Sequence, residues 1–384
     1  MHVLVSGGGT AGHIYPALAV AGVLASYGDA TVEFVGAPGS LEERLARDAG
    51  VPFVPVRAQG WDRARPLTLV TGVARTIGSL ARSIALLRRG HVDAVCGFGG
   101  YVSLPLGIAA VLSRVPLVIH EQNAVPGLTN RVLARFATAV CLTYPDSASG
   151  LRGGVRSKVT GNPVRASVMA ADRAAGRAAF GAGPDDTLLL VFGGSRGARH
   201  LNSATVNLYS RFRKFERLRV VQIAGPAEAE TVRGLLRDVA GGSVPEWWDV
   251  REYVDGMGDL IAAADVVVCR SGATTLAELS ARGKAMVLVP YPYATDDHQT
   301  GNARPFVEAG GAEMVADAEL DTPLFAGAVM RLLADPAKRA EMERDTAALG
   351  RPRAAQAVAE AVRDAASAPR PGRGTMMDEG NDAS

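Results

Sequence analysis

The chain has 384 residues, of which 48% are hydrophobic and 21% charged, and its formal net charge is +2. This length predicts two domains of about 150–200 residues each, and the small net charge argues against a nucleic-acid-binding protein. The three cysteines, Cys96, Cys141 and Cys269, lie far apart in apolar runs, which is typical of reduced cytosolic thiols and of neither disulfides nor a metal site.

The first half of the chain alternates short apolar strands with helical patterns. Strands are predicted at 2–6, 31–35, 93–97, 116–120 and 138–142, and helices at 16–27, 40–49, 67–89, 103–113 and 127–136. Such alternation predicts a parallel sheet covered by helices on both faces. Gly161 and Pro163 interrupt the pattern, so we expect an N-terminal domain of residues 1–163.

The second half repeats this organisation. Strands are predicted at 187–192, 219–224, 250–254, 265–269 and 286–290, and helices near 199–212, 227–239, 256–263, 273–282, 300–309 and 322–334. We therefore expect a second α/β domain at 164–350, followed by a last helix at about 353–367. Residues 368–384, rich in Pro, Gly and Asp, are predicted to be disordered.

Each half begins with the same motif, in which an apolar strand is followed by a glycine-rich loop and the start of a helix. The two loops are residues 7–13 (GGGTAGH) and 193–198 (GGSRGA). Glycines let the backbone approach a ligand closely, and the free N–H groups of a helix start favour an anion. A further loop, residues 97–101 (GFGGY), is predicted to be a second anion site in the first domain. The sequence thus predicts a phosphate or diphosphate ligand between two domains.

Residues 7–12 also satisfy the dinucleotide-binding pattern G-x-G-x-x-G. A nicotinamide-binding fold needs an acidic residue at the end of its second strand, but that strand ends at Val35 and Gly36 with Glu33 inside it. An NAD(P) oxidoreductase is therefore not expected. His13 ends the loop at a helix start, which keeps an imidazole neutral, as a general base requires. A packing or capping histidine is the other interpretation.

Three further segments place polar residues at the ends of strands, where parallel sheets bind ligands. They are residues 120–123 (HEQN), 269–278 (CRSGATTLAE) and 290–303. Glu278 lies about two turns into a helix and could accept both hydroxyls of a ribose, although a solvated helix glutamate fits the same pattern. The last segment suits the recognition of sugar hydroxyls by amides and carboxylates.

The segment 57–89 carries arginines at 57, 63, 65, 75, 82, 88 and 89 against a single acid, Asp62, and includes Trp61. Its apolar residues form either the core-facing stripe of a surface helix or a surface that docks on an anionic membrane. No signal peptide and no apolar run of the ~18–20 residues that span a bilayer are visible. We expect a soluble protein, or at most one that lies on a membrane surface.

Taken together, these motifs resemble the MurG family. Its members are bacterial enzymes that transfer N-acetylglucosamine from UDP-N-acetylglucosamine to lipid I, the undecaprenyl-diphosphate-linked muramyl-peptide, and so form lipid II. The resemblance rests on GGGTAGH (7–13), GFGGY (97–101), HEQN (120–123), GNPVR (161–165), GGSRGA (193–198), CRSGATTLAE (269–278) and DHQTGNA (297–303), which run in family order. It implies a GT-B fold, in which two Rossmann-like domains face an interdomain cleft and the last helix crosses back to the first domain.

The resemblance also implies roles for individual residues. His13 would be the catalytic residue, and Gly9, Gly99, Gly100 and Tyr101 would bind the acceptor diphosphate. In the second domain, Ser195 would contact the donor diphosphate, the backbone at Val254 would contact the uracil, and Gln299 would contact the sugar. The phosphate and the ribose would be bound by Ala273, Thr274, Thr275, Leu276, Ala277 and Glu278. The donor site would be completed by Thr10, Ala11, Gly12, Asn123 and Arg165. Two positions depart from the family pattern: Ala11, where glycine is more common, and His298, where glutamine is common.

The implied chemistry is a single inverting displacement, in which the muramyl 4-hydroxyl attacks the anomeric carbon and UDP leaves. No D-x-D triplet occurs in the chain, so we expect no metal site and no cofactor beyond Mg²⁺ loosely bound to UDP. The implied location is the cytoplasmic face of the cell membrane, as a peripheral protein. The alternatives are a GT-B glycosyltransferase with another lipid or natural-product acceptor, a UDP-sugar 2-epimerase, for which no convincing set of acidic residues is found, and a non-catalytic UDP-sugar sensor.

Overall fold

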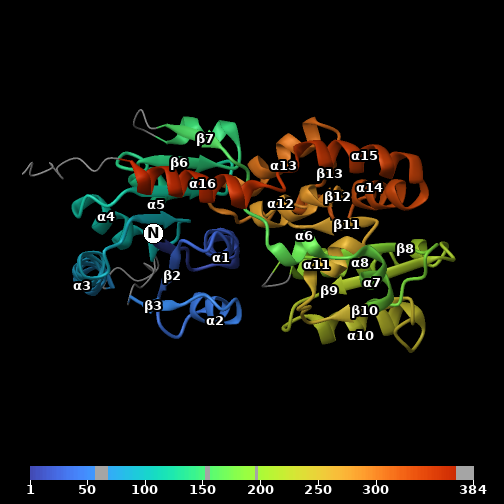
Figure 1. Cartoon of the computed structure of the whole chain (residues 1–384). Coiled ribbons are helices and arrows are strands. Elements are labelled where there is room, and N and C mark those ends of the chain that lie inside the picture. The colour runs from blue at the N-terminus through green and yellow to red at the C-terminus, as the bar shows by residue number, and fades with distance from the viewer. Residues whose placement is uncertain (57–67, 152–155, 195–197, 369–384) are drawn as a thin grey trace, which may run out of the picture.

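The computed structural model describes residues 1–56, 68–151, 156–194 and 198–368. Its strands form two separate parallel sheets, one of seven strands and one of six. The sheets lie side by side, each with helices on both faces (Figure 1). Trp61, Ser195 and residues 369–384, most of the tail expected to be disordered, lie outside the described residues.

The first sheet is built from residues 2–159. Its strands are β1 (His2–Ser6), β2 (Thr31–Gly36), β3 (Phe53–Pro55), β4 (Ala94–Gly97), β5 (Leu117–Glu121), β6 (Ala139–Leu142) and β7 (Ser157–Val159). Its helices are α1 (Ala11–Ser26), α2 (Leu41–Asp48), α3 (Thr68–Arg89), α4 (Ser103–Leu112), α5 (Leu128–Leu133) and the 3₁₀ turn η1 (Pro145–Gly150).

The second sheet is built from residues 187–314. Its strands are β8 (Thr187–Phe192), β9 (Leu218–Ile223), β10 (Trp248–Arg251), β11 (Val266–Cys269), β12 (Ala285–Leu288) and β13 (Ala312–Met314). The helices from residue 166 to 349 are α6 (Ala166–Ala170), α7 (Arg173–Ala179), α8 (Arg199–Val206), α9 (Tyr209–Phe212), α10 (Ala229–Ala240), α11 (Met257–Ala263), α12 (Ala273–Ala281), α13 (His298–Glu308), α14 (Pro323–Ala334) and α15 (Pro336–Leu349), with 3₁₀ turns η2 (Thr295–Asp297) and η3 (Asp317–Glu319). The last helix, α16 (Ala354–Ser367), packs on the first sheet.

Both sheets are doubly wound. The strand order is β3-β2-β1-β4-β5-β6-β7 in the first and β10-β9-β8-β11-β12-β13 in the second. The direction of winding therefore changes beside β1 and beside β8. Ligands of such sheets bind at the carboxyl ends of the strands next to this switch point, which is where the two glycine-rich loops begin.

Strand β8 illustrates why these sequences form a central parallel strand. Leu188, Leu189, Leu190 and Val191 are all fully buried. Because side chains alternate across a strand, Leu189 and Val191 enter the core on one face of the sheet, and Leu188 and Leu190 enter the core on the other. A continuous apolar run is the pattern expected of a strand covered on both faces.

The last helix, α16, packs against the first domain. Val358, Ala359 and Val362 of α16 are buried in the core of the first sheet, and Arg363 pairs with Asp29 at 2.8 and 2.9 Å. Figure 1 shows α16 in red beside the strands of the N-terminal half. The helix expected at about 353–367 thus runs back from the second sheet to the first.

Most predicted strands lie within two residues of the observed ones, but several helices differ. The helix predicted at 16–27 begins at Ala11, with Pro16 inside it, although proline is more common in the first turn of a helix. The helix predicted at 199–212 is two helices, α8 and α9. The strand predicted at 250–254 is β10, at 248–251, because the buried Trp248 belongs to it.

The elements that the sequence did not predict are short or polar. Strands β3, β7 and β13 have three residues each, and every residue of β7 is exposed. Helix α15 buries Met342 and Thr346 on an otherwise charged surface, so it lacks the apolar stripe that marks a helix against a core.

Candidate functional site

The carboxyl ends of strands from the two sheets meet in one region, here called the domain junction. Asn302 donates from Nδ2 to Asn123 Oδ1 at 3.2 Å, and its Oδ1 accepts from Ala124 N at 2.8 Å. Thr274 Oγ1 donates to the carbonyl oxygen of Gly12 at 3.1 Å. The structure therefore brings together three residues predicted from separate motifs, Gly12, Asn123 and Thr274.

Pro16 explains why Gly12 is available for this contact. Within a helix, the carbonyl of residue i accepts from the N–H of residue i+4. Proline has no N–H, so Pro16 leaves the carbonyl of Gly12 without its helical donor. The hydroxyl of Thr274, at the start of α12, supplies the missing hydrogen bond from the second domain.

Two glycine loops pack directly against each other on the first-domain side of the junction. Gly9, Gly99 and Gly100 have φ angles of 84°, 86° and 81°, values that favour glycine. A Cβ on Gly100 would lie 2.2 Å from the carbonyl oxygen of Gly8, and one on Gly9 would lie 3.2 Å from the ring of Tyr101. Side chains at these positions would push the two loops apart.

His13 lies between these loops at the start of α1. Its Nδ1 is 3.0 Å from the carbonyl oxygen of Gly8 and 3.3 Å from Thr10 Oγ1. Because a carbonyl can only accept, Nδ1 carries the proton and Nε2 has its lone pair free. Nε2 faces Gly99, where a Cβ would lie 3.4 Å away.

The environment of His13 favours the neutral ring. Burial lowers the pKa of His13 below its ordinary value of 6.5, and His298 acts in the same direction, whereas the Gly8 hydrogen bond and the carboxylate of Glu121 oppose it. A neutral imidazole with a free Nε2 can accept a proton near pH 7. The geometry therefore suits a general base.

The first three residues of the HEQN segment are fully buried and bonded within the protein. His120 Nε2 lies 2.9 Å from the carbonyl oxygen of Gly161, and Gln122 Nε2 lies 3.1 Å from His120 Nδ1. Burial lowers the pKa of His120 to about 4. His120 thus connects the end of β5 to Gly161, which follows β7, and Asn123 is the residue of this segment that is bonded to Asn302 across the junction.

Glu121 organises the residues that follow it. It is buried, and its Oε1 accepts from Asn123 N at 3.0 Å, while Oε2 accepts from Gly127 N at 3.0 Å and Asn130 Nδ2 at 2.8 Å. These bonds fix Asn123 and the start of α5 beside the glycine loops. They also place a carboxylate close enough to His13 to influence its pKa.

Arg165 and Glu278, both predicted to bind the donor, are bound to each other. Arg165 Nε donates to Glu278 Oε1 at 2.7 Å, and Nη2 donates to Oε2 at 3.0 Å. The guanidinium also lies over the ring of Tyr15, 4.3 Å from its centroid. Glu278 is 5% exposed, so it is not the solvated helix glutamate that the sequence left open.

The other residues of the predicted donor segment begin α12. Thr274 and Thr275 are half-buried, and Ala277 is half-buried too. Leu276 is fully buried in the core of the second sheet and Ala273 is nearly so; only their backbone groups can reach a ligand. Ser271 Oγ donates to the carbonyl oxygen of Gln299, and Gln299 Oε1 accepts from Tyr291 N at 2.9 Å.

The remaining predicted residues lie around the same region. Thr10 is exposed and Ala11 is half-buried at the start of α1. Val254 is half-buried and packs at the edge of the second core. Ser195 lies outside the described residues, although Gly194 beside it has a φ of 92°.

Three junction residues were not given a role by the sequence. Asn302 belongs to the predicted DHQTGNA segment, and its position after a strand is the only signal that could have identified it. Tyr15 carries no motif. Asp296 has a φ of 52° in η2 and pairs with Arg131 at 2.9 Å, and neither residue type nor spacing predicts that contact.

No group of three or more His, Cys, Asp or Glu that could hold a metal ion occurs among the described residues.

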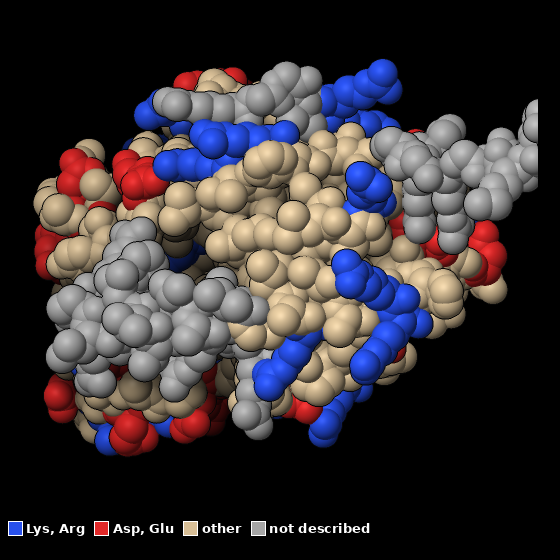
Figure 2. Space-filling model, turned by 90° about the vertical axis from the view of Figure 1, so that its left-hand side faces the viewer, with Lys and Arg blue, Asp and Glu red and all other residues tan. Residues whose placement is uncertain are grey.

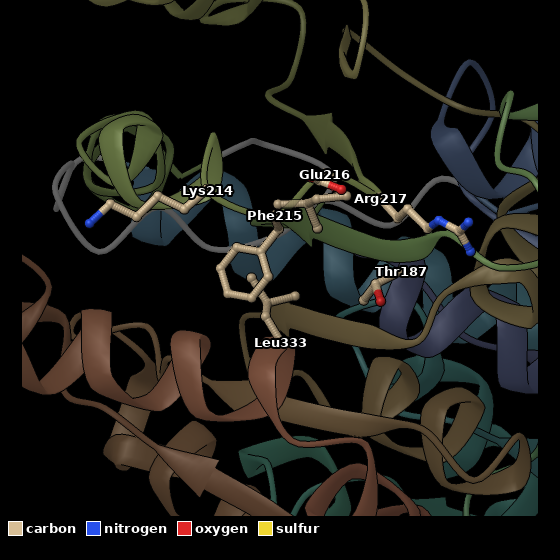
Figure 3. A pocket seen from close by; sticks show the side chains of 7 residues that line it. Thr187, Lys214, Phe215, Glu216, Arg217 and Leu333 are labelled. Carbon is tan, nitrogen blue, oxygen red and sulfur yellow. The ribbon is translucent and has the colours of Figure 1, made fainter.

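A hollow of about 340 Å³ lies at the amino end of β8, lined by Thr187, Phe215 and Leu333 among others (Figure 3). It is at the opposite edge of the second sheet from the junction. In the described part of the chain, no helix is long and apolar enough to cross a membrane.

Two doubly wound sheets that share one site between their carboxyl ends are the architecture of the GT-B glycosyltransferases. Two family descriptions match the chain: the glycosyltransferase family 28 N-terminal domain over residues 3–142, and the glycosyltransferase family 28 C-terminal domain over residues 188–358. The chain belongs to glycosyltransferase family 28 and, within it, to the MurG family.

The relatives that support this assignment match the chain over nearly its whole length. The UDP-N-acetylglucosamine–N-acetylmuramyl-(pentapeptide) pyrophosphoryl-undecaprenol N-acetylglucosamine transferase of Desulforudis audaxviator is 39% identical, over 94% of this chain and 98% of its own. The protein of the same name from Chlorobaculum tepidum is 38% identical over the same shares of the two chains.

Solved structures agree on the fold. MurG from Acinetobacter baumannii superposes with a TM-score of 0.74 at 29% identity, covering 94% of this chain and 99% of its own. A UDP-GlcNAc 2-epimerase from Neisseria meningitidis superposes with a TM-score of 0.66 at 13% identity, covering 95% of this chain and 100% of its own. The second likeness shows the shared fold alone.

Proposed function

We propose that this chain transfers N-acetylglucosamine from UDP-N-acetylglucosamine to the muramyl 4-hydroxyl of the undecaprenyl-diphosphate-linked muramyl-pentapeptide. The names of the relatives, which match 94% of the chain, supply the reaction. The observation that carries it onto this chain is the position of His13. Its free Nε2 lies between two glycine loops of the first domain, and the preceding residue, Gly12, accepts a hydrogen bond from Thr274 at the start of α12 in the second domain.

In the proposed reaction, His13 Nε2 takes the proton of the muramyl 4-hydroxyl. The hydroxyl oxygen forms a bond to the anomeric carbon, and the bond from that carbon to the diphosphate breaks on the opposite face. The hydrogen bond from Nδ1 to Gly8 fixes the tautomer, and the carboxylate of Glu121 favours the imidazolium that forms. General-base assistance of this kind contributes about 10²–10⁴ to a rate.

The second domain would hold the donor. We propose that the first-turn N–H groups of α12 and the loop containing Ser195 stabilise the diphosphate as it leaves, because fixed dipoles directed at a developing charge need no reorganisation. Glu278 would accept the ribose hydroxyls, the backbone of Val254 would contact the uracil, and Gln299 would contact the sugar. No metal is needed in this scheme, although Mg²⁺ loosely bound to UDP is compatible with it.

The first domain would hold the acceptor. We propose that the backbone of Gly9, Gly99 and Gly100, with Tyr101 beside them, forms the site for the acceptor diphosphate. The positive φ angles of these glycines turn successive peptide groups in a way that forms anion-binding concavities. The position of His13 Nε2 against Gly99 would then place the base next to the acceptor.

A lipid-linked acceptor requires contact with a membrane, and we propose that the first domain makes it as a peripheral protein on the cytoplasmic face. Leu112 at the end of α4, Leu128 in α5 and Phe136 just after α5 are 62%, 68% and 60% exposed, with the exposed Arg114 and Arg135 next to them in sequence. Figure 2 shows this end of the molecule, where Lys and Arg side chains lie above, to the right of and below an area of uncharged residues. Apolar side chains flanked by cations are typical of proteins that dock on anionic lipid.

Only residues 78–89 of the predicted basic segment have described side chains. In the described part of α3, Leu80, Ile84 and Leu87 pack into the core of the first domain, so its apolar stripe faces inward there. Arg82, Arg88 and Arg89 are exposed and can still interact with anionic headgroups.

The test is the transfer of labelled N-acetylglucosamine from UDP-N-acetylglucosamine to a short-chain lipid I analogue, with wild-type protein and the His13→Ala variant. Product with release of UDP from the wild type, and its loss in the variant, supports the proposal. Tight binding of UDP-N-acetylglucosamine without product would contradict it and indicate another acceptor or a sensor.

Flotation with vesicles tests the membrane contact. We expect binding to vesicles that contain anionic lipid and weaker binding of the Leu128→Glu/Phe136→Glu variant. Binding that does not depend on lipid charge or on these two residues would contradict the proposed surface.

A further inference from the structure

His200 lies in the first turn of α8, immediately after the glycine-rich loop that begins at Gly193. Its ring connects this helix start to the segment that follows β13. Nδ1 is 2.8 Å from Asp317 Oδ2, and Nε2 is 3.0 Å from Asp321 Oδ2. Since carboxylates only accept hydrogen bonds, both ring nitrogens must carry protons to satisfy both contacts. The arrangement therefore selects the imidazolium.

Asp317 continues the connection to the other anion-binding segment of the domain. Its Oδ1 lies 2.5 Å from Arg270 Nη2. The buried Arg270 also donates from Nη1 to the carbonyl oxygens of Val289 and Pro290 at 3.2 and 3.0 Å, and it precedes Ser271 and the start of α12. A chain of charged contacts thus runs from α8 through His200, Asp317 and Arg270 to α12.

The charges around His200 make this chain sensitive to pH. Asp317 and Asp321 face the ring from the segment after β13, Arg270 lies behind Asp317, and the adjacent Arg199 is paired with Glu228. Hydrogen bonds to the two aspartates raise the pKa of His200 above 6.5. The contacts are complete at low pH, and they are lost as the pH rises through this raised value.

We propose that the imidazolium of His200 is a positioning group for the donor diphosphate: it fixes the start of α8 relative to the start of α12 and adds a positive charge beside them. This inference rests on the proposed function, because it assumes that the diphosphate lies between these two helix starts. His200 itself need not touch the donor. Its loss of charge would weaken donor binding without changing the base, His13.

The experiment measures the dissociation constant of UDP-N-acetylglucosamine by titration calorimetry between pH 6 and 8.5 at constant ionic strength. This donor is a diphosphate diester and stays fully ionised over that range. A single charge at a helix start changes an affinity by about two- to fivefold, so we expect wild-type binding to weaken by that factor as the pH rises. His200→Gln keeps a polar side chain without the charge, and we expect its binding to be weak at all pH values.

Two further variants make the result specific. Asp321 is 62% exposed at its side chain, so Asp321→Asn should fold normally, and it should move the midpoint of the wild-type transition to lower pH. His91→Asn removes an exposed imidazole of the first domain at a residue with a φ of 46°, a conformation that asparagine tolerates, and it should leave the transition unchanged.

The inference is overturned if His200→Gln follows the wild-type pH profile, if Asp321→Asn leaves the midpoint unchanged, or if His200→Gln lowers only the melting temperature. Binding with the expected profile but no transfer to lipid I would contradict the proposed function and support the role of His200. No binding of UDP-N-acetylglucosamine at any pH would contradict both.

Discussion

Replacing Glu278 with alanine separates its two roles, as the partner of Arg165 and as the proposed ligand of the ribose. The structural cost follows from the pair itself. Both oxygens of Glu278 accept from Arg165, at 2.7 and 3.0 Å, and the two side chains are 6% and 20% exposed. Removing one partner of a fully buried pair costs about 3–5 kcal/mol. Because Arg165 keeps some contact with water and lies over Tyr15, we expect the free energy of unfolding to fall by about 2–3 kcal/mol.

The Glu278→Ala substitution should also raise the KM for UDP-N-acetylglucosamine. A hydrogen bond to a charged group contributes about 1.5–3 kcal/mol. Because the oxygens of Glu278 already accept from Arg165, a ribose replaces an existing bond and its net contribution is smaller, about 0.5–1.5 kcal/mol. Losing this contact should therefore raise the KM for UDP-N-acetylglucosamine by about 2- to 10-fold. A fall in stability alone does not produce this change, because the folded fraction alters kcat per total protein and leaves KM unaffected.

The assay compares UDP-N-acetylglucosamine with its 2′-deoxyuridine analogue in four proteins: wild type, Glu278→Ala, Arg165→Ala and the double variant. We expect wild type and Arg165→Ala to prefer the ribose form, and both proteins without Glu278 to lose that preference. Urea unfolding of the same proteins should show that the double variant recovers stability relative to Glu278→Ala, since no unpaired guanidinium remains. A Glu278→Ala protein that still prefers the ribose form would refute the ligand role and leave only the ion pair.

Three further results are expected. His13→Ala should lower kcat by about 10²–10⁴ with a modest change in donor affinity, and near-wild-type turnover would exclude His13 as the base. Because burial lowers the pKa of His13 below 6.5 and the base acts when neutral, kcat at saturating donor and acceptor should be on a plateau above pH 7 and fall only in the acid range. A kcat that already falls as the pH is lowered toward 7 from above would contradict this. Gly100→Ala should destabilise by at least about 2 kcal/mol, from strain at positive φ and the 2.2 Å approach to Gly8. The matched control is Gly22→Ala, in mid-helix, where nothing lies within 4 Å of the added Cβ. In chemical denaturation, its free energy of unfolding should rise by about 0.5–1 kcal/mol. Equal effects of the two substitutions would contradict the argument.

Much of the fold can be predicted because its signals are local. The strand predicted at 187–192 is β8 without correction, since a strand covered on both faces is a continuous apolar run. The glycine-rich loops are equally local signals, because glycine marks the point where the chain turns sharply from a strand into a helix. The GT-B fold itself is confirmed by the family match and by the superposition on a solved MurG.

The contacts that organise the junction could not be predicted, because they join residues far apart in sequence. Thr274 and Gly12 are 262 positions apart, and Arg165 and Glu278 are 113 apart. Each pair depends on how the two domains pack, which no local pattern encodes. A polar residue at a strand end is typical of a ligand site, yet the ring of His120 is buried and bonded to Gly161 and Gln122 within the protein. The roles of individual site residues, including His13, stay predictions until the variants are measured.

The junction contacts also determine how donor binding must work. Glu278 is bonded to Arg165, Asn123 to Asn302, and Thr274 to Gly12, so the polar groups proposed to bind the donor already have partners. A ribose or sugar hydroxyl that reaches one of them replaces an existing hydrogen bond, and such an exchange yields only the difference between two similar free energies. In the proposed site, most of the affinity would then come from the diphosphate, because the free N–H groups of a helix start favour a negative charge. The hydroxyl contacts would instead determine which nucleotide and which sugar are accepted, because an analogue that breaks an internal bond without replacing it leaves a buried polar group unpaired.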